Sequence, residues 1–434
     1  MMVRSITRWS LVMGLVTGIG GCGGGSSATT GSSSGSDGSV GGGGSSAAVA
    51  QGCNWLYESD AQTANIEYPE THAVYWVAAL PDSVPSGDHI EIAGLSASAR
   101  YFSFEIYSES GTLESGLNDT DIFGETLPVS ESVQAGKGYR VSVIYSLTTA
   151  TSGTTLVANP AALSLRAPAH KFLLYRLYLP TSGAADAASL PALTYVARDG
   201  SSTALSTNPD QNSCATIRAN IQQALTDGRD AGSSDDGSVA ATPVPAVKPA
   251  RMKIFRSSLG KFQNLGARYM YLKSNNSLGD MMIVRGKAPA YSGSGQTAQV
   301  RYWSICSDEF PAPHRVVACL ADQEALIGAD GYYNVIIADK APAAGYQSEF
   351  DYLPWGQTAF GAPIYRQLLA APTFTRSISG SNSSLDPGTA QGDYFPQTTY
   401  CSSAVFAANL GAGSAAVFNA CKNTQGIGLV PDLG

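Results

Sequence analysis

The sequence predicts a mainly β protein made of two tandem modules that resemble β-sandwiches or jelly rolls, with one or two short helices. Segments rich in β-branched and aromatic residues alternate with Gly, Pro, Ser and Asp, as strands alternate with turns. Charged residues make up only 14% of the 434 residues, and 21 Tyr outnumber 13 Phe, which favours an exported β-rich chain. A block of these segments occurs twice, so we expect one module to have been copied.

The N-terminus has the features of a bacterial lipoprotein signal. Arg4 and Arg8 precede a short apolar run over 10–21, which is shorter than the roughly 20 residues that a permanent membrane helix needs. Ile19-Gly20-Gly21-Cys22 then resembles a lipobox, in which the cysteine is lipidated and becomes the mature N-terminus. We therefore predict a signal peptide over 1–21 and lipidation at Cys22. The alternative is an ordinary secretory signal with an incidental cysteine.

A lipid anchor would hold the protein at a membrane, because each buried CH₂ contributes about 0.8 kcal/mol. The expected location is the cell envelope. Gly23, rather than Asp, follows Cys22, which resembles outer-membrane lipoproteins if the host is Gram-negative. Residues 22–50 are almost wholly Gly, Ser, Ala and Thr and are predicted to form a flexible tether. The Gly-x-Ser-x-Gly match at 31–35 lacks the strand and helix of a nucleophile elbow.

The remaining six cysteines predict disulfides, since an even number in an exported chain is typical of them. Fifteen pairings are possible. Nearness in sequence favours two pairs and leaves a third: Cys306 with Cys319, Cys401 with Cys421, and Cys53 with Cys214. The chain has no Cys-x-x-Cys and its four His are scattered, so neither a metal nor another cofactor is predicted. A net charge of −8 without any basic run argues against a nucleic-acid partner.

The repeat is clearest where Arg100-Tyr101-Phe102-Ser103 matches Arg301-Tyr302-Trp303-Ser304. The match continues downstream in the same order, at 117–121 with 320–324 and at 175–176 with 365–366. We therefore predict a first β module over 51–225 and a second over 251–434. The Gly-, Ser- and Pro-rich residues 226–250 are predicted to be a linker.

The first module contains clear candidates for strands, at 73–80, 89–95, 100–108, 139–146 and 171–179. Within 100–107 the alternation places Arg100 with Phe102, Phe104 and Ile106 on one face, and Tyr101, Ser103, Glu105 and Tyr107 on the other. We expect the first face to pack in a core and the polar, aromatic face to be available for a ligand. Helices are expected after Ser213, with Ile217, Ile221 and Leu225 on one stripe, and over 402–410.

The second module resembles a bacterial domain of unknown function, number 1214. The residues that carry the resemblance are Tyr302-Trp303-Ser304, Asp330-Gly331-Tyr332, Tyr352-Leu353-Pro354-Trp355, and Tyr365-Arg366 followed by Pro372. It covers about 286–372 well and the first module more loosely, where Leu-Pro-Trp has no clear partner. The resemblance implies a β-sandwich fold and brings no settled activity, so function must be argued from a site.

The repeated arginines are candidates for binding an anionic or sugar ligand. Arg100 and Arg301 carry a planar fork of donors that suits carboxylates and hydroxyls. The structural alternative is that each arginine pairs with a carboxylate of the protein. Repetition favours the alternative, since one active site seldom needs the same group twice.

Two pairs of acids are also candidates: Asp119 with Asp121, and Asp322 with Glu324. On a strand, this i, i+2 spacing would place both carboxylates on one face, where they suit Ca²⁺ or acid/base chemistry on a glycoside. The alternative is a solvated turn, which Asn118 fits.

Among the aromatics, Trp355 follows Pro354 and precedes Gly356, so we expect it on a loop near a cleft. Tyr101 and Tyr302 are further candidates for stacking on sugar rings or apolar ligands, against the alternative of core packing. A catalytic group of Ser304, His314 and Asp322 is weakly supported, because Ser304 lies mid-strand and His314 fits an exposed hairpin tip.

Two classes of function remain. The first is a lipid-anchored, non-catalytic surface protein that binds a glycan or a small amphipathic molecule. The alternative is an exported hydrolase of a glycan or ester, with acids in a cleft between the modules. The hydrolase gains support if the acids converge on one pocket with Trp355 and their pKa values are pushed apart. It loses support if the acids lie on separate surface turns.

Overall fold

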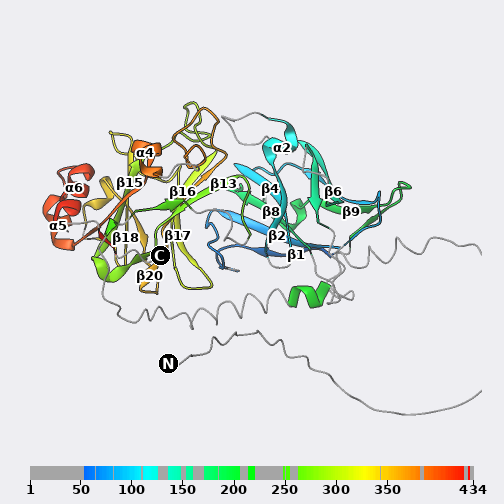
Figure 1. Cartoon of the computed structure of the whole chain (residues 1–434), viewed down its shortest axis with the longest axis horizontal. Helices are drawn as coiled ribbons and strands as arrows, with labels where there is room; N and C mark the ends of the chain where they lie inside the picture. The colour runs from blue at the N-terminus through cyan, green and yellow to red at the C-terminus, as the bar shows by residue number, and fades with distance from the viewer. Residues whose placement is uncertain are drawn as a thin grey trace, which may run out of the picture. The chain divides into compact units, whose positions relative to one another are not determined.

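A computed structural model of the chain is mainly β, as predicted, and its strands form two similar sets of sheets (Figure 1). The structure describes residues 53–63, 65–81, 83–108, 111–125, 135–147, 153–159, 171–183, 185–205, 214–219, 248–249, 251–254, 262–342, 344–381, 386–424 and 429–430. The predicted signal peptide, Cys22, the tether and almost all of the linker lie outside these residues. No helix in this part of the chain is long and apolar enough to cross a membrane.

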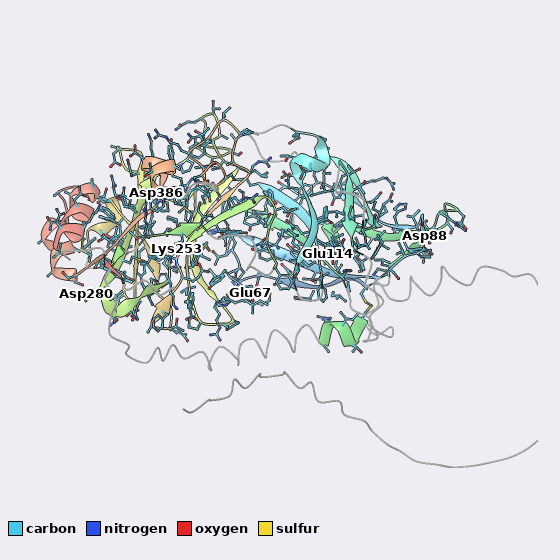
Figure 2. All side chains as sticks on the ribbon, viewed as in Figure 1. Glu67, Asp88, Glu114, Lys253, Asp280 and Asp386 are labelled. Atoms are coloured by element: carbon cyan, nitrogen blue, oxygen red, sulfur yellow. A yellow bond between two sulfur atoms is a disulfide. The ribbon has the colours of Figure 1, made fainter. Side chains whose placement is uncertain are left out.

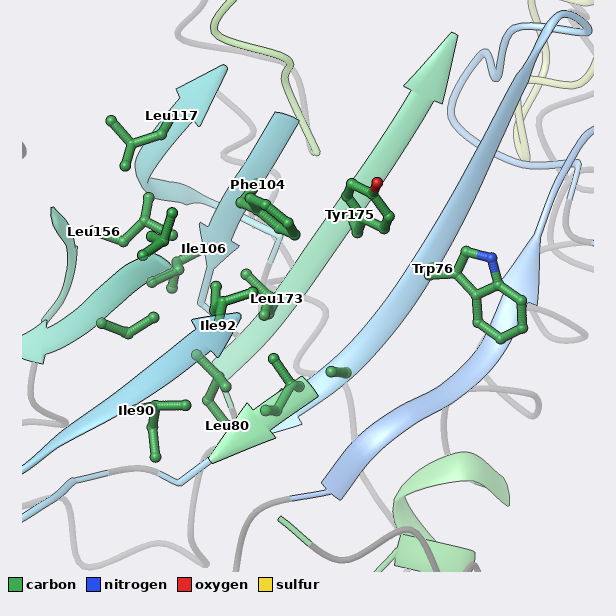
Figure 3. Close-up of a cluster of buried hydrophobic side chains, with 14 of the residues drawn as sticks. Trp76, Leu80, Ile90, Ile92, Phe104, Ile106, Leu117, Leu156, Leu173 and Tyr175 are labelled. Carbon is green, nitrogen blue, oxygen red and sulfur yellow. The ribbon is translucent and has the colours of Figure 1, made fainter. Parts of the chain in front are cut away.

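The first module is a sandwich of two five-stranded sheets. One sheet has the order β1 (Cys53–Ser59), β2 (Ala73–Leu80), β8 (Lys171–Tyr178), β4 (Tyr101–Tyr107), β5 (Leu113–Asn118). The other has the order β10 (Ser202–Ala204), β9 (Ala192–Val196), β3 (His89–Leu95), β6 (Gly138–Tyr145), β7 (Thr155–Ala158). Figure 3 shows their shared core, in which Phe104 and Leu173 of one sheet pack with Ile90 and Ile92 of the other.

The second module is built in the same way. Its five-stranded sheet has the order β12 (Lys253–Ile254), β13 (Ala267–Tyr271), β21 (Ile364–Leu368), β16 (Tyr302–Asp308), β17 (Val316–Ala321). Its four-stranded sheet has the order β19 (Asp351–Pro354), β18 (Tyr332–Ala338), β15 (Met281–Lys287), β22 (Gln397–Cys401). Two short ladders join β14 (Ser274–Asn275) to β20 (Phe360–Gly361), and β11 (Lys248–Pro249) to β23 (Leu429–Val430).

Strand order and register make the two modules equivalent. The order β1-β2-β8-β4-β5 corresponds to β12-β13-β21-β16-β17, and β9-β3-β6-β7 corresponds to β22-β15-β18-β19. The only parallel pairs among the described ladders of named strands are β6 with β7 and β18 with β19, which are counterparts. Ser103 lies opposite Arg176, just as Ser304 lies opposite Arg366. The repeated residues of the sequence therefore occupy the same positions in both copies.

The helices are more numerous than the one or two predicted. The α-helices are α2 (Asp119–Phe123), a helical segment over 214–219, α4 (Pro387–Gln391), α5 (Ser403–Asn409) and α6 (Ser414–Thr424). The 3₁₀ turns are η1 (Ala187–Ser189), η2 (Asn276–Leu278), η3 (Tyr346–Ser348) and η4 (Gly392–Tyr394). The helix expected over 402–410 is α5, and the Ser402 side chain caps its start. Ser213, Ile221 and Leu225 lie outside the described residues.

The three predicted disulfides are all present: Cys53–Cys214, Cys306–Cys319 and Cys401–Cys421. Cys306 and Cys319 lie directly opposite each other on β16 and β17. Each bond joins residues of one module, so the modules are held to each other by other contacts.

Candidate functional site

The polar, aromatic face of β4 is not available for a ligand, contrary to expectation. Tyr101, Ser103 and Tyr107 are fully buried and Glu105 is 1% exposed. Tyr101 packs in one cluster with Tyr302 and Leu368 of the second module. This contact joins the outer face of sheet β1-β2-β8-β4-β5 in the first module to the outer face of sheet β12-β13-β21-β16-β17 in the second, and we call it the seam. Burial of these rings removes apolar area from water, which stabilises the contact by about 25 cal/mol per Å².

Both repeated arginines cross the seam. Arg100 donates from Nη1 to Asp322 of the second module, and from Nη2 to Gln323 Oε1 at 2.6 Å. Arg301 donates from Nη1 to Asp119 Oδ2 of the first module at 3.1 Å, and to the Arg100 carbonyl oxygen at 2.8 Å. The two ion pairs are reciprocal, since each copy supplies the arginine for the other copy's aspartate. The arginines thus pair with carboxylates, as the structural alternative describes.

The two aspartates also hold the backbone of the neighbouring strand. Asp119 Oδ2 accepts the Phe102 N–H at 3.3 Å, and Asp322 Oδ2 accepts the Trp303 N–H at 3.1 Å. Burial raises the pKa of each carboxyl to about 6, and the arginine beside it only partly opposes this shift. An acid/base pair requires two groups with well-separated pKa values, whereas the pKa values of Asp119 and Asp322 are equal.

The i, i+2 acids do not share a face, contrary to the calcium and acid/base expectations. Asp121 turns back at the start of α2, where its Oδ2 accepts the Asn118 N–H at 3.0 Å in a capping box. Glu324 accepts the Ala321 N–H at 3.1 Å and lies 3.0 Å from His72 Nε2. The spacing belongs to a helix start and a turn rather than to a strand, so the members of each pair point to different partners.

A second pair of arginines lies deeper in the seam. In the first module Arg176 donates from Nε to Glu105 Oε2 at 3.0 Å. Its Nη2 donates to the Tyr107 hydroxyl and to the carbonyl oxygen of Phe262, a residue of the second module, both at 2.6 Å. The guanidinium is therefore satisfied from both sides of the seam.

The equivalent Arg366 has a different acid. Position 306, which corresponds to Glu105, is a cysteine bonded to Cys319, so this position offers no carboxylate. Arg366 instead donates to Glu70, which reaches across from the first module and is fully buried. The counterpart of Glu70 in the second module is the amide Asn264, since both carbonyl oxygens accept the N–H three residues later. Each arginine thus has one carboxylate partner. Arg176 pairs with Glu105 of its own module, whereas Arg366 pairs with Glu70 of the other module.

Glu70 and its neighbour His72 were not predicted as site residues, because neither is repeated in the sequence. Burial favours a higher pKa for Glu70, but Arg366, His72 and Ser304 outweigh burial and lower the pKa to about 2. His72 Nδ1 lies 3.2 Å from Glu70 Oε1, and Glu324 lies on its other side. Burial lowers the pKa of His72, yet the two carboxylates prevail and raise it overall.

The serine–histidine candidates do not form a catalytic group. Ser304 donates from Oγ to Glu70 Oε2 at 2.6 Å, and Asp322 is occupied by the arginine described above. His314 is half-buried rather than exposed, and its ring stacks on Tyr68 of the first module with 4.7 Å between centroids. These side chains all serve the contact between modules.

Glu70, Cys306 and Cys319 are the one group of three potential metal ligands found among the described residues. Because the two cysteines share a disulfide, their sulfurs are not thiolates and do not suit a metal. A small cavity of about 330 Å³ also opens at the seam beside Arg100 and Gln323. Arg100 there is already neutralised by Asp322.

Trp355 lies beside a hollow of about 420 Å³ in the second module. The tryptophan is only 4% exposed and donates from Nε1 to the Thr358 carbonyl oxygen at 2.9 Å, so it forms a wall and presents no open ring face. None of the acids named in the sequence analysis lines this hollow. Its polar lining comprises Asn276, Asp280, Asp339, Lys340 and Ser403.

The polar side chains of the hollow differ in how they are engaged. Asp280, labelled in Figure 2, accepts the Ser403 N–H at 2.7 Å, and this bond lowers the pKa of its carboxyl. Within the described part of the chain, the side chains of Asn276, Asp339 and Lys340 make no hydrogen bond or ion pair. Three polar groups therefore face the hollow without a protein partner.

No family model and no curated protein matches the sequence, so membership of domain 1214 stays a prediction. Among solved structures, the chain is similar to an uncharacterised protein from Burkholderia cenocepacia, at 14% identity and a TM-score of 0.45, over 73% of this chain and 79% of that one. It is also similar to a protein from Vibrio parahaemolyticus, at 13% identity and a TM-score of 0.39, over 76% of this chain and 91% of that one.

Proposed function

We propose that the chain is a lipid-anchored, exported protein of the cell envelope that binds a glycan or a small amphipathic molecule without chemical turnover. The lipobox-like Ile19-Gly20-Gly21-Cys22 and the Gly/Ser tether support the anchor and the location, which is the outer membrane if the host is Gram-negative. The binding site in this proposal is the hollow beside Trp355, in place of the polar, aromatic face of β4.

One observation carries the proposal. The charged side chains that cross the seam are paired with one another, whereas the side chains of Asn276, Asp339 and Lys340 at the hollow make no hydrogen bond or ion pair within the described residues. A ligand gains hydrogen bonds from groups that the protein leaves unused, because paired groups would first have to be separated. The hollow is concave and combines apolar walls with a few polar groups, as small-molecule sites do.

The hydrolase alternative has less support. It requires an acid and a base at one cleft, yet Asp119 and Asp322 are held by arginines at separate, equivalent places of the seam. Asp121 and Glu324 serve a helix start and a turn.

A ligand array with product analysis tests the proposal. The full chain carrying Cys22→Ser, which removes the acyl acceptor, is applied to immobilised glycans and amphipathic compounds, and bound ligands are then analysed by mass spectrometry. We expect binding with the ligand recovered intact. Cleavage of a glycan or ester would favour the hydrolase, and the absence of any binding would refute the proposal. Incorporation of a palmitate analogue by the native chain, lost in Cys22→Ser, checks the anchor.

A further inference from the structure

The hollow marks a place where the two copies of the module differ. Ile337 pairs with Leu353 on the parallel strands β18 and β19, and Val143 pairs with Leu156 on their counterparts β6 and β7. Counting two residues on from each pair makes Asp339 equivalent to Tyr145. The same count makes Trp355 equivalent to Ala158.

In the first module this place is closed. The Tyr145 ring packs against the hydrophobic core, and its hydroxyl donates to the Pro81 carbonyl oxygen on the connection between β2 and β3. Asp339 at the same position is shorter, exposed and charged, so it does not bridge to the corresponding connection. The hollow therefore lies where a tyrosine plug of the first copy is replaced by a carboxylate.

The neighbouring Asp280 is part of the framework. Its counterpart Asp88 accepts the Arg198 N–H at 2.9 Å, just as Asp280 accepts the Ser403 N–H at 2.7 Å. Because this bond is kept in both copies, it explains the acid without a ligand. The groups special to the second module are those that lack a protein partner: Asn276, Asp339 and Lys340.

We propose that this hollow binds a neutral, hydroxyl-rich ligand of one or two sugar rings, an inference that rests on the proposed function above. The Asp339 carboxylate accepts hydrogen bonds from hydroxyls, Lys340 donates them, and the Asn276 amide does both. Asp280 and Asp339 outnumber Lys340, so the lining is net negative and disfavours an anionic ligand.

Size and wall chemistry point to the same ligand class. A volume of about 420 Å³ is near the small end of ligand sites, which span roughly 300–1,000 Å³, and it suits a short ligand rather than an extended chain. The nearly buried Trp355 leaves little ring surface for an apolar tail. Recognition therefore rests on hydrogen bonds, which is the means by which hydroxyl-rich ligands are held.

Calorimetric titration of the full chain carrying Cys22→Ser tests the inference. The probes are maltose and N,N′-diacetylchitobiose as neutral sugars, digalacturonate as an anionic sugar, and anilinonaphthalene sulfonate as an amphipathic compound. We expect a neutral sugar to bind, and Asp339→Asn or Asn276→Ala to weaken its binding about tenfold, as the loss of a hydrogen bond to a charged or polar group does. Asp199→Asn, at an exposed aspartate of the first module, should leave binding unchanged.

Asp339→Tyr is the most direct variant, because it introduces the side chain that closes the same place in the first module. It should abolish sugar binding while the thermal unfolding temperature stays the same or rises. Sugar binding that survives Asp339→Tyr would overturn the hollow as the binding site, here and in the proposed function, and would leave standing only the binding of a ligand without turnover. Binding of the anionic or amphipathic probe alone would overturn the ligand class, without harm to the proposed function. If no probe and no compound of the array binds, both fail together.

Discussion

At the scale of single residues, Glu70 shows why a buried charge needs its partner. The carboxylate is fully buried and depends on Arg366, Ser304 and His72. Removing an ion from water costs several kcal/mol, and only close opposite charges and hydrogen bonds offset that cost. The pKa of about 2 means that here they do so with a surplus.

The pH dependence of stability follows from this shift. The folded-state pKa of Glu70, about 2, lies below its usual 4.5, so its contribution is fully present above pH 4.5 and is lost as the pH falls toward 2. Glu70→Gln removes the charge, leaves Arg366 without a counter-ion and should lower the free energy of unfolding at pH 7 by about 3–5 kcal/mol. Urea unfolding between pH 7 and pH 2.5 measures both effects, and the variant should lose less stability toward acid than the parent.

Glu324→Gln is the matched control, at the other side of His72. Its side chain is 45% exposed, so the same change should cost less than about 1 kcal/mol. Equal losses in the two variants would mean that burial of Glu70 does not govern its contribution.

At the scale of elements, β4 illustrates what an alternating pattern of apolar and polar residues can predict. The period of two located β4 to within a residue of its expected ends and separated the two faces of 101–107 correctly. It was wrong for Arg100, which was expected on the core face and instead pairs across the seam with Asp322. It did not reveal what covers the polar face, because a solvent-exposed sheet and a sheet covered by a second module share the same alternation. Polar side chains such as Ser103 and Glu105 were compatible with either.

The missed elements have equally physical reasons. Asp119–Phe123 is a helix of five residues inside a turn-like segment, too short for a 3.6-residue pattern to emerge. Trp355 was correctly placed beside a cleft because Pro and Gly flank it. The unpaired side chains of that cleft, Asn276, Asp339 and Lys340, come from segments far apart in sequence, so no local motif joins them. The disulfide pairs were predictable because two of them close short loops.

The disulfides should differ in their effect on stability. Cys53–Cys214 closes 161 residues and Cys306–Cys319 closes 13, so chain entropy assigns them about 5 and about 3 kcal/mol. Replacing both cysteines of a pair by Ala and measuring urea unfolding at pH 7 tests the order. A larger loss for Cys306→Ala/Cys319→Ala would show that its packing against Glu70 and Arg366 outweighs loop length.

At the scale of the whole molecule, the reciprocal ion pairs couple the two modules. Arg100 and Arg301 each bind an aspartate of the other copy, and a shared cluster of rings lies between them. One module cannot unfold without exposing these charges and rings of the other. The described residues of both modules accordingly belong to one compact unit.

Calorimetry should therefore show a single unfolding transition, with equal van't Hoff and calorimetric enthalpies. Arg100→Met with Arg301→Met leaves the two buried aspartates without a counter-ion and should divide the transition into two. Arg140→Met is the control, because this arginine of the first module has a side chain that is 73% exposed. Two transitions in the parent chain would contradict coupling through the seam.

The reciprocity of the seam has a consequence for origin. A contact in which each partner repeats the other's bonds is the geometry of a twofold homodimer, and we infer that this chain descends from one by gene fusion. Joining two subunits by a linker raises their effective concentration to the millimolar range, so the pairing persists even as individual bonds drift. Fusion also allows the two modules to diverge in sequence. The second module has Asn264 where the first has Glu70, and Asp339 where the first has Tyr145.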